Sequence, residues 1–154
     1  MMSDQDPKEN TTHDVRHEAE EAMRRYQEQV NNAELERGSV PLIQGDVTLR
    51  LEVQGATTPM LVTIGDDVVI GRRDPTMTMI PDLDLTPYGA YQMGISRRHA
   101  ILRVHNQRLE LIDLGSRNGS YLNGRRLVAH QPVQLANGDE VRLGKIIMRL
   151  FIQD

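Results

Sequence analysis

Residues 94–124 read GISRRHAILRVHNQRLELIDLGSRNGSYLNG, and this stretch decides the fold class. It contains two short apolar runs, at residues 100–104 and 109–112, and Asn-Gly pairs follow at 118–119 and 123–124. Asn-Gly pairs between short apolar runs are typical of the tight turns that join β-strands. The stretch therefore predicts short strands and turns, without a helix.

The same pattern extends on both sides of this stretch. Further short apolar or alternating runs occupy residues 47–53, 60–64, 68–70, 140–143 and 146–152. No helical periodicity separates them, so we expect an all-β sandwich over residues 47–154. A sandwich gathers its loops at its two ends on a rigid base, which makes those loops the expected place for binding residues.

The N-terminal quarter has a different composition. Residues 1–13 are polar and predict a disordered tail. Residues 14–37 predict a helix, because apolar residues recur there every three or four positions. That apolar stripe is half alanine, so the helix could pack on the domain, pair with a second copy or stay partly unfolded. Residues 38–46 predict a linker.

Composition excludes several classes of function. The 154 residues are 38% hydrophobic, which suits one modest core. The chain has no cysteine, so disulfides, thiolate metal sites and cysteine nucleophiles are excluded. No apolar run approaches the roughly 20 residues that span a bilayer, and the first residues lack the pattern of a secretory signal. We expect a soluble, cytoplasmic protein without a membrane partner.

Charge is distributed unevenly along the chain. Residues 1–37 carry ten acidic and five basic side chains, whereas residues 38–154 carry twelve and thirteen. A nearly neutral domain without an aromatic stacking platform makes nucleic-acid binding unlikely. Twelve of its thirteen cations are arginine, which suits bidentate recognition of a phosphate or carboxylate.

Three loops concentrate Gly, Arg, Ser and Asn: residues 71–75, 94–99 and 115–124. Together with the strand pattern they resemble a forkhead-associated (FHA) domain over roughly residues 60–152. The motifs that carry this resemblance are Gly71-Arg72, Ser96-x-x-His99, Asn118-Gly119, Asn123-Gly124, Gly138-Asp139 and Leu143-Gly144. The resemblance implies a sandwich of about eleven strands whose loops bind a phosphothreonine in a partner protein.

The resemblance also implies roles for single residues. The residues implied in phosphopeptide binding are Arg72, Ser96, Arg97, Arg117 and Asn118. Those implied in bracing the loops are Gly71, His99, Gly119 and Asn123.

The physical chemistry agrees, because a phosphothreonine offers about −1.5 to −2 charges and three acceptors to guanidinium and hydroxyl donors. Taken singly, each residue has a plainer interpretation, Arg72 as a solvated cation and Asn123-Gly124 as a hairpin turn. We interpret Arg98, Arg125 and Arg126 as exposed charges.

Enzyme chemistry is not predicted. His13 and His17 have no metalloprotease glutamate between them, and Ser96 with His99 does not define a catalytic pair. No cofactor or metal site is expected. We therefore expect a phosphothreonine-binding adaptor in Ser/Thr kinase signalling. The alternative is a phosphate-independent oligomerisation or scaffold module that uses the same fold and the N-terminal helix.

Two further features leave alternatives open. Thr11 and Thr12 are candidate phosphorylation sites whose product would bind the chain's own loops, or they simply cap the following helix. In the long loop of residues 82–94, Tyr88, Tyr91 and Met93 could form an apolar shelf for the ligand or pack back onto the sandwich.

Overall fold

The structure is a computed structural model that describes residues 20–21, 24, 38 and 40–153. Within the expected helix of residues 14–37, the described residues Glu20, Glu21 and Arg24 are helical. The expected tail of residues 1–13, with Thr11 and Thr12, lies outside the described residues. The domain boundaries therefore stay predictions.

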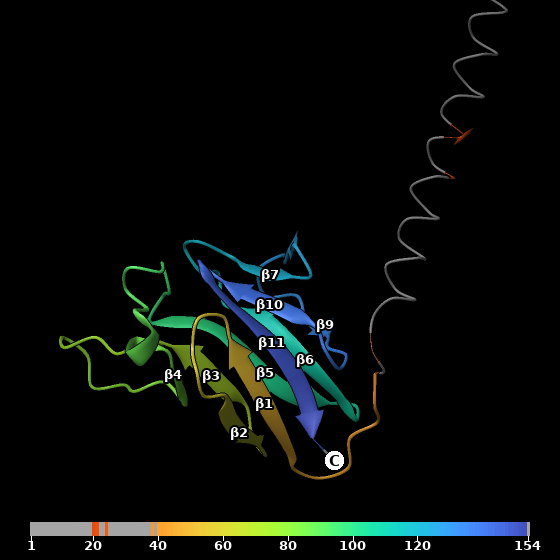
Figure 1. Cartoon of the computed structure of the whole chain (residues 1–154), viewed down its shortest axis with the longest axis horizontal. Helices are drawn as coiled ribbons and strands as arrows, with labels where there is room; N and C mark the ends of the chain where they lie inside the picture. Colours follow the sequence, from red (N-terminus) through yellow and green to blue (C-terminus); the bar gives the residue numbers. More distant parts are fainter. Residues whose placement is uncertain (1–19, 22–23, 25–37, 39, 154) are drawn as a thin grey trace, which may run out of the picture. The chain divides into compact units, whose positions relative to one another are not determined.

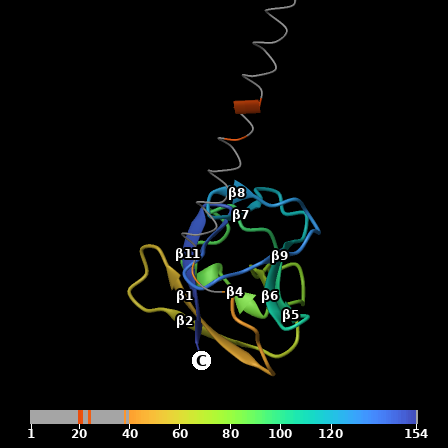
Figure 2. The ribbon, with the colours of Figure 1, turned by 90° about the vertical axis from the view of Figure 1, so that its right-hand side faces the viewer.

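Two β-sheets pack face to face in the described part of the chain (Figures 1 and 2). Their strands are β1 (Val47–Val53), β2 (Met60–Ile64), β3 (Val68–Gly71), β4 (Leu83–Asp84), β5 (Arg98–His105), β6 (Arg108–Asp113), β7 (Ser120–Leu122), β8 (Arg125–Arg126), β9 (Val133–Gln134), β10 (Glu140–Leu143) and β11 (Ile146–Gln153). A 3₁₀ turn, η2 (Thr86–Tyr88), follows β4.

The six-stranded sheet has the order β2-β1-β11-β10-β7-β8, and the five-stranded sheet has the order β4-β3-β5-β6-β9. The short β3–β4 pair is parallel, and every other pair with a recorded register is antiparallel. The predicted all-β sandwich of about eleven strands is therefore confirmed.

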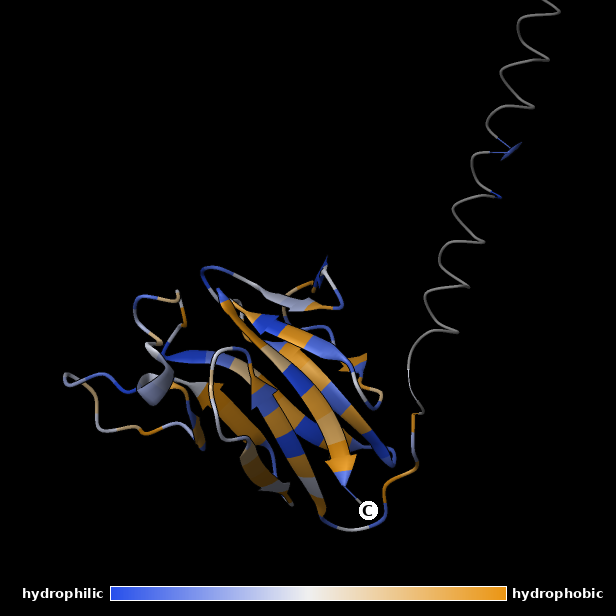
Figure 3. Cartoon of the chain, viewed as in Figure 1, coloured by the Kyte–Doolittle hydropathy of each residue, from blue (hydrophilic) through white to orange (hydrophobic). Residues whose placement is uncertain are grey.

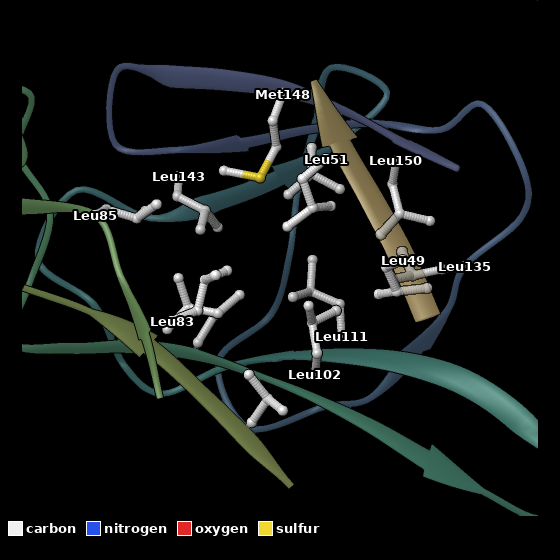
Figure 4. Close-up of a cluster of buried hydrophobic side chains, with 14 of the residues drawn as sticks. Leu49, Leu51, Leu83, Leu85, Leu102, Leu111, Leu135, Leu143, Met148 and Leu150 are labelled. Atoms are coloured by element: carbon white, nitrogen blue, oxygen red, sulfur yellow. The ribbon is translucent and has the colours of Figure 1, made fainter. Parts of the chain in front are cut away.

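Alternation of side chains along the strands builds the core. In β1, Leu49 and Leu51 are buried, Thr48 and Arg50 are half-buried and Glu52 is exposed. Hydrophobic and hydrophilic residues likewise alternate along the strands in Figure 3. Leucines from both sheets meet between the layers (Figure 4). Each fully buried leucine contributes about 1.5–3 kcal/mol, so truncating Leu49 to alanine should destabilise the fold by roughly 2–5 kcal/mol.

Four short strands, β4, β7, β8 and β9, were not indicated by the sequence. They have two or three residues each, too few for an alternating pattern to show. The turn between β7 and β8 has positive φ at both central residues, Asn123 (49°) and Gly124 (85°). The Asn123 side chain also donates to Asp139 Oδ1 (3.0 Å) and accepts from the Glu140 N–H (2.9 Å), which ties this hairpin to the start of β10.

No helix among the described residues is both long and apolar enough to cross a membrane.

Candidate functional site

Three loops meet at one end of the sandwich: the β3–β4 loop (residues 72–82), the β4–β5 loop (residues 85–97) and the β6–β7 loop (residues 114–119). The Arg72 N–H donates to the Arg97 carbonyl at 3.3 Å. The Arg117 N–H donates to Ser96 Oγ at 3.2 Å. These two bonds bring together four of the five residues that the sequence implied in phosphopeptide binding.

Arg72 is positioned by a close approach of two backbones. An added Cβ on Gly71 would lie 1.8 Å from the Arg97 carbonyl oxygen, so only glycine allows β3 to pass this loop. The half-buried Arg72 side chain then donates from Nε to the Ile95 carbonyl at 2.8 Å. Its guanidinium carbon lies 5.1 Å from the centre of the Tyr91 ring. The planar group is thus held in place before any ligand arrives.

Ser96 presents a hydroxyl proton. Its Oγ already accepts the Arg117 N–H, so the hydroxyl hydrogen is available for an acceptor outside the protein. The Ser96 N–H donates to Nδ1 of His99 at 3.0 Å, which fixes the local backbone.

His99 joins two of the loops from inside the fold. Its ring is fully buried; Nδ1 accepts from Ser96, and Nε2 donates to the Gly119 carbonyl at 2.8 Å. These bonds define the neutral tautomer with hydrogen on Nε2. Burial lowers the pKa of His99, against smaller opposing effects from the Gly119 carbonyl and Asp113. Both ring nitrogens are occupied by backbone partners, so His99 does not act as a base toward Ser96 Oγ.

Arg97 is held by a carboxylate that the sequence reasoning missed. Its Nε lies 2.8 Å from Asp74 Oδ2, and its Nη1 lies 3.0 Å from Met77 Sδ. Hydrogen bonds from the Thr76 hydroxyl and N–H, aided by the guanidinium groups of Arg97 and Arg72, lower the pKa of Asp74. Asp74 is therefore ionised at neutral pH and orients Arg97, whose side chain remains 51% exposed.

Asn118 is the fifth implied residue, and it lies beside the other four. Its Nδ2 donates to the Gly94 carbonyl at 2.9 Å. Gly94 has φ +77°, and an added Cβ there would lie 2.6 Å from that nitrogen, so a glycine is required for the contact. The side chains of Asn118 and Arg117 are exposed at the rim of the site.

The β6–β7 loop is organised around a second missed carboxylate. Asp113 Oδ1 accepts from the hydroxyls of Ser116 (2.5 Å) and Ser120 (2.6 Å), and Oδ2 accepts from the N–H groups of Gly115 and Ser116 (both 3.0 Å). Burial raises the pKa of this carboxyl, but hydrogen bonds from Ser116 and Ser120 outweigh burial and lower the pKa overall. The charged carboxylate shapes the turn that presents Arg117 and Asn118.

A local signal for both missed carboxylates exists in the sequence. Asp74-Pro-Thr76 and Asp113-Leu-Gly-Ser116 each place a hydroxyl or turn residue two or three positions after an aspartate, which is typical of Asx turns.

The sequence left open whether Tyr88, Tyr91 and Met93, in the long loop of residues 82–94, are available to a ligand or pack onto the sandwich. Tyr91 is 75% exposed and faces Arg72, whereas Tyr88 and Met93 are half-buried and pack against the core.

The donors of the site are guanidinium, hydroxyl and amide groups, which suit contacts with an anion. Among the described residues there is no cluster of three His, Asp or Glu side chains that could hold a metal ion. The structure therefore gathers the sequence-implied residues into an exposed, cationic rim on a rigid base.

Comparison with known proteins agrees with this geometry. The FHA domain family model matches residues 68–144. The glycogen accumulation regulator GarA of Mycobacterium tuberculosis is 46% identical over 54 residues, which are 33% of this chain and 30% of that protein. The oxoglutarate dehydrogenase inhibitor of Corynebacterium jeikeium is 45% identical over 51 residues, 33% of each chain. This chain thus spans about a third of the curated relatives that it matches.

Two solved structures share the fold. The FhaA FHA domain, complexed with the intracellular domain of a second protein, matches with 27% identity and a TM-score of 0.51 over 66% of this chain and 98% of that one. An FHA domain from an analysis of phosphothreonine-dependent FHA interactions matches with 26% identity and a TM-score of 0.53 over 70% and 98%. From its strands, its loops and these matches, the chain belongs to the FHA domain family.

Proposed function

We propose that this chain is a cytoplasmic, non-catalytic adaptor that binds phosphothreonine in partner proteins of a Ser/Thr kinase pathway. One observation carries the proposal: Arg72 from the β3–β4 loop gathers with the Ser96 hydroxyl and Arg97 of the β4–β5 loop at one partly exposed site. A phosphothreonine carries about −1.5 to −2 charges and three strong acceptors, which matches two guanidinium groups and one free hydroxyl proton.

The expected strength follows from the state of each donor. A hydrogen bond to a charged group contributes about 1.5–3 kcal/mol, less where water screens it. Arg72 is half-buried and already oriented by the Ile95 carbonyl, so little side-chain entropy is lost on binding. Removing its guanidinium should weaken phosphopeptide binding about tenfold to a hundredfold.

Asn118 would hold the peptide backbone. Its Nδ2 already donates to Gly94, which leaves Oδ1 to accept a peptide N–H and the second amide hydrogen to donate to a peptide carbonyl. Such contacts are independent of the ligand's side chains.

The relatives support the same interpretation. GarA and the oxoglutarate dehydrogenase inhibitor are named as a regulator and an inhibitor. The solved FHA domains were studied in phosphothreonine-dependent interactions and in complex with another protein's intracellular domain.

The test is a titration of the full chain with matched peptides that carry Thr, phosphothreonine or phosphoserine. We expect binding that requires phosphothreonine and that falls at least tenfold in Arg72→Ala. Arg149→Ala is the matched control, because Arg149 is an exposed β11 cation whose recorded bond is to the Gly138 carbonyl. Phosphate-independent binding, or equal losses in both variants, would contradict the proposal.

We also propose that phosphorylation of Thr11 or Thr12 creates a ligand for the chain's own loops, because tethering raises the effective concentration of a weak ligand. A full chain treated with the kinase should then bind an external phosphothreonine peptide more weakly than the Thr11→Ala/Thr12→Ala variant does after the same treatment. Equal affinities would argue for the helix-capping role instead.

A further inference from the structure

The outer face of the six-stranded sheet carries a row of two arginines and a tyrosine close to the site. Tyr121 on β7 lies opposite Arg126 on β8 and Arg142 on β10. The guanidinium carbons of Arg126 and Arg142 lie 5.9 and 3.9 Å from the centre of the Tyr121 ring. The neighbours of Arg142 in β10, Val141 and Leu143, are buried, so this row points away from the core.

The two arginines of this row have no carboxylate partner among the described residues, although Glu140 lies on the same face of β10 two positions before Arg142. Within the described part of the chain, neither Arg126 nor Arg142 forms an ion pair, and the Arg142 Nε is buried without a hydrogen-bond partner. Arg50 lies on the same face, stacks on Phe151 at 4.7 Å and likewise has a buried Nε without a hydrogen-bond partner, but it differs in having a carboxylate, Glu52, at 3.3 Å. Two cations beside one ring repel each other, and an anion placed between them would relieve that repulsion.

The row is continuous with the candidate phosphothreonine site. An added Cβ on Gly119, the residue after Asn118, would lie 3.0 Å from Arg126 Nε. The Gly144 N–H, two residues after Arg142, donates to the Gly119 carbonyl at 3.0 Å. Three residues of extended chain span about 10 Å, so a segment that flanks a phosphothreonine bound at the loops can extend toward the adjoining sheet face.

We propose that Arg126, Tyr121 and Arg142 form a second anion-binding surface that takes a carboxylate-rich segment flanking the phosphothreonine of the same partner. The inference rests on the proposed function and extends it to the class of partner. Guanidinium groups that an aromatic ring holds in place are suited to bidentate contacts with carboxylates. Two partly exposed ion pairs should strengthen binding about three- to tenfold.

The test uses the full chain and three phosphothreonine peptides of equal length. The first, the Gln peptide, carries four Gln residues on each side of the phosphothreonine. In the two Glu peptides, either the four Gln residues on the N-terminal side or the four on the C-terminal side are replaced with Glu. We expect one Glu peptide to bind about three- to tenfold more tightly than the Gln peptide, with the gain shrinking at high salt. The gain should vanish in Arg126→Gln/Arg142→Gln, which removes two positive charges, and persist in Arg50→Gln, which removes one positive charge from the same sheet face.

The outcomes separate the two proposals. Absence of any gain with either Glu peptide, or equal loss of the gain in Arg50→Gln, overturns the second surface and leaves phosphothreonine binding intact. Absence of binding by the Gln peptide overturns the proposed function and this inference with it. If the double variant does not bind the Gln peptide normally, the single variant Arg126→Gln replaces it, because Arg126 is exposed. This variant should lose at least half of the gain in affinity that the Glu peptide shows over the Gln peptide. A variant that keeps the whole gain overturns the inference.

Discussion

Replacing Asp113 with alanine should strongly destabilise the protein, whereas replacing it with asparagine should cost much less. The carboxylate receives four hydrogen bonds, two from hydroxyls and two from backbone N–H groups, and the residue is 4% exposed. Alanine leaves all four donors without this acceptor, including the hydroxyl of the fully buried Ser120.

The magnitude follows from these contacts. Each bond to a charged acceptor contributes about 1.5–3 kcal/mol, but the cost of burying the charge offsets part of the sum. We therefore expect Asp113→Ala to lower the free energy of unfolding by about 3–5 kcal/mol. Asparagine can keep Oδ1 on the two N–H groups and turn Nδ2 toward Ser116 and Ser120, whose hydroxyls can rotate to accept. Asp113→Asn should then cost about 1–2 kcal/mol.

The assay is urea unfolding followed by circular dichroism, because the chain has no tryptophan to report by fluorescence. Asp82→Ala is the control, since the exposed Asp82 accepts a single recorded bond from the Val69 N–H. It should cost at most about 1 kcal/mol. A loss below about 1 kcal/mol for Asp113→Ala, or equal losses for the Ala and Asn variants, would refute the reasoning about this carboxylate.

Three further predictions concern the site. Gly94→Ala should weaken phosphothreonine-peptide binding at least about tenfold in a titration, because the added Cβ would displace the Asn118 amide. Gly124→Ala is the control: Gly124 has a similarly positive φ, but an added Cβ there meets no atom within 4 Å, so the affinity should not change. Burial lowers the pKa of His99 below its ordinary value of 6.5, so as the pH falls the imidazole is protonated in the unfolded chain before it is protonated in the folded chain. The free energy of unfolding should therefore be highest above about pH 7 and decline as the pH falls through 6.5 toward the lowered pKa. Urea midpoints between pH 5 and 8 test this, and His99→Gln should flatten the decline; an unchanged slope contradicts it. Asp74→Asn should tighten phosphopeptide binding about two- to fivefold at low salt, because it removes a negative charge beside the proposed phosphate site, and the difference should disappear at high salt. Weaker binding of the Asn variant would show that the contact of Asp74 with the Arg97 guanidinium matters more than the charge.

Much of the sandwich is predictable from local sequence, because the two faces of a strand differ in what they contact. The alternation in residues 47–53 and 146–152 places apolar side chains inward, and β1 and β11 pair from Thr48 opposite Gln153 to Val53 opposite Met148. Strands of two residues, such as β4 and β8, leave no such pattern. Their existence depends on neighbours that supply the pairing hydrogen bonds, so only the assembled sheets show them.

The candidate binding residues in the three loops could also be predicted from the sequence, through its resemblance to the FHA domain. The contacts that turn those loops into one site were not, because they join residues far apart in the chain. Ser96 and the Arg117 N–H are 21 residues apart, and Asn118 and the Gly94 carbonyl are 24 apart. Their meeting depends on how the two sheets pack and on the backbone approach that Gly71 allows.

The sequence by itself determined the fold class and the residue types in the loops of the proposed site, since periodicity and turn chemistry are local properties. Tertiary structure alone decided the partners of those residues: the carboxylate of Asp74 behind Arg97, the Asp113 hub, and the neutral tautomer of His99. The physical reason is that ion pairs and buried hydrogen bonds depend on distance in space, and packing sets those distances.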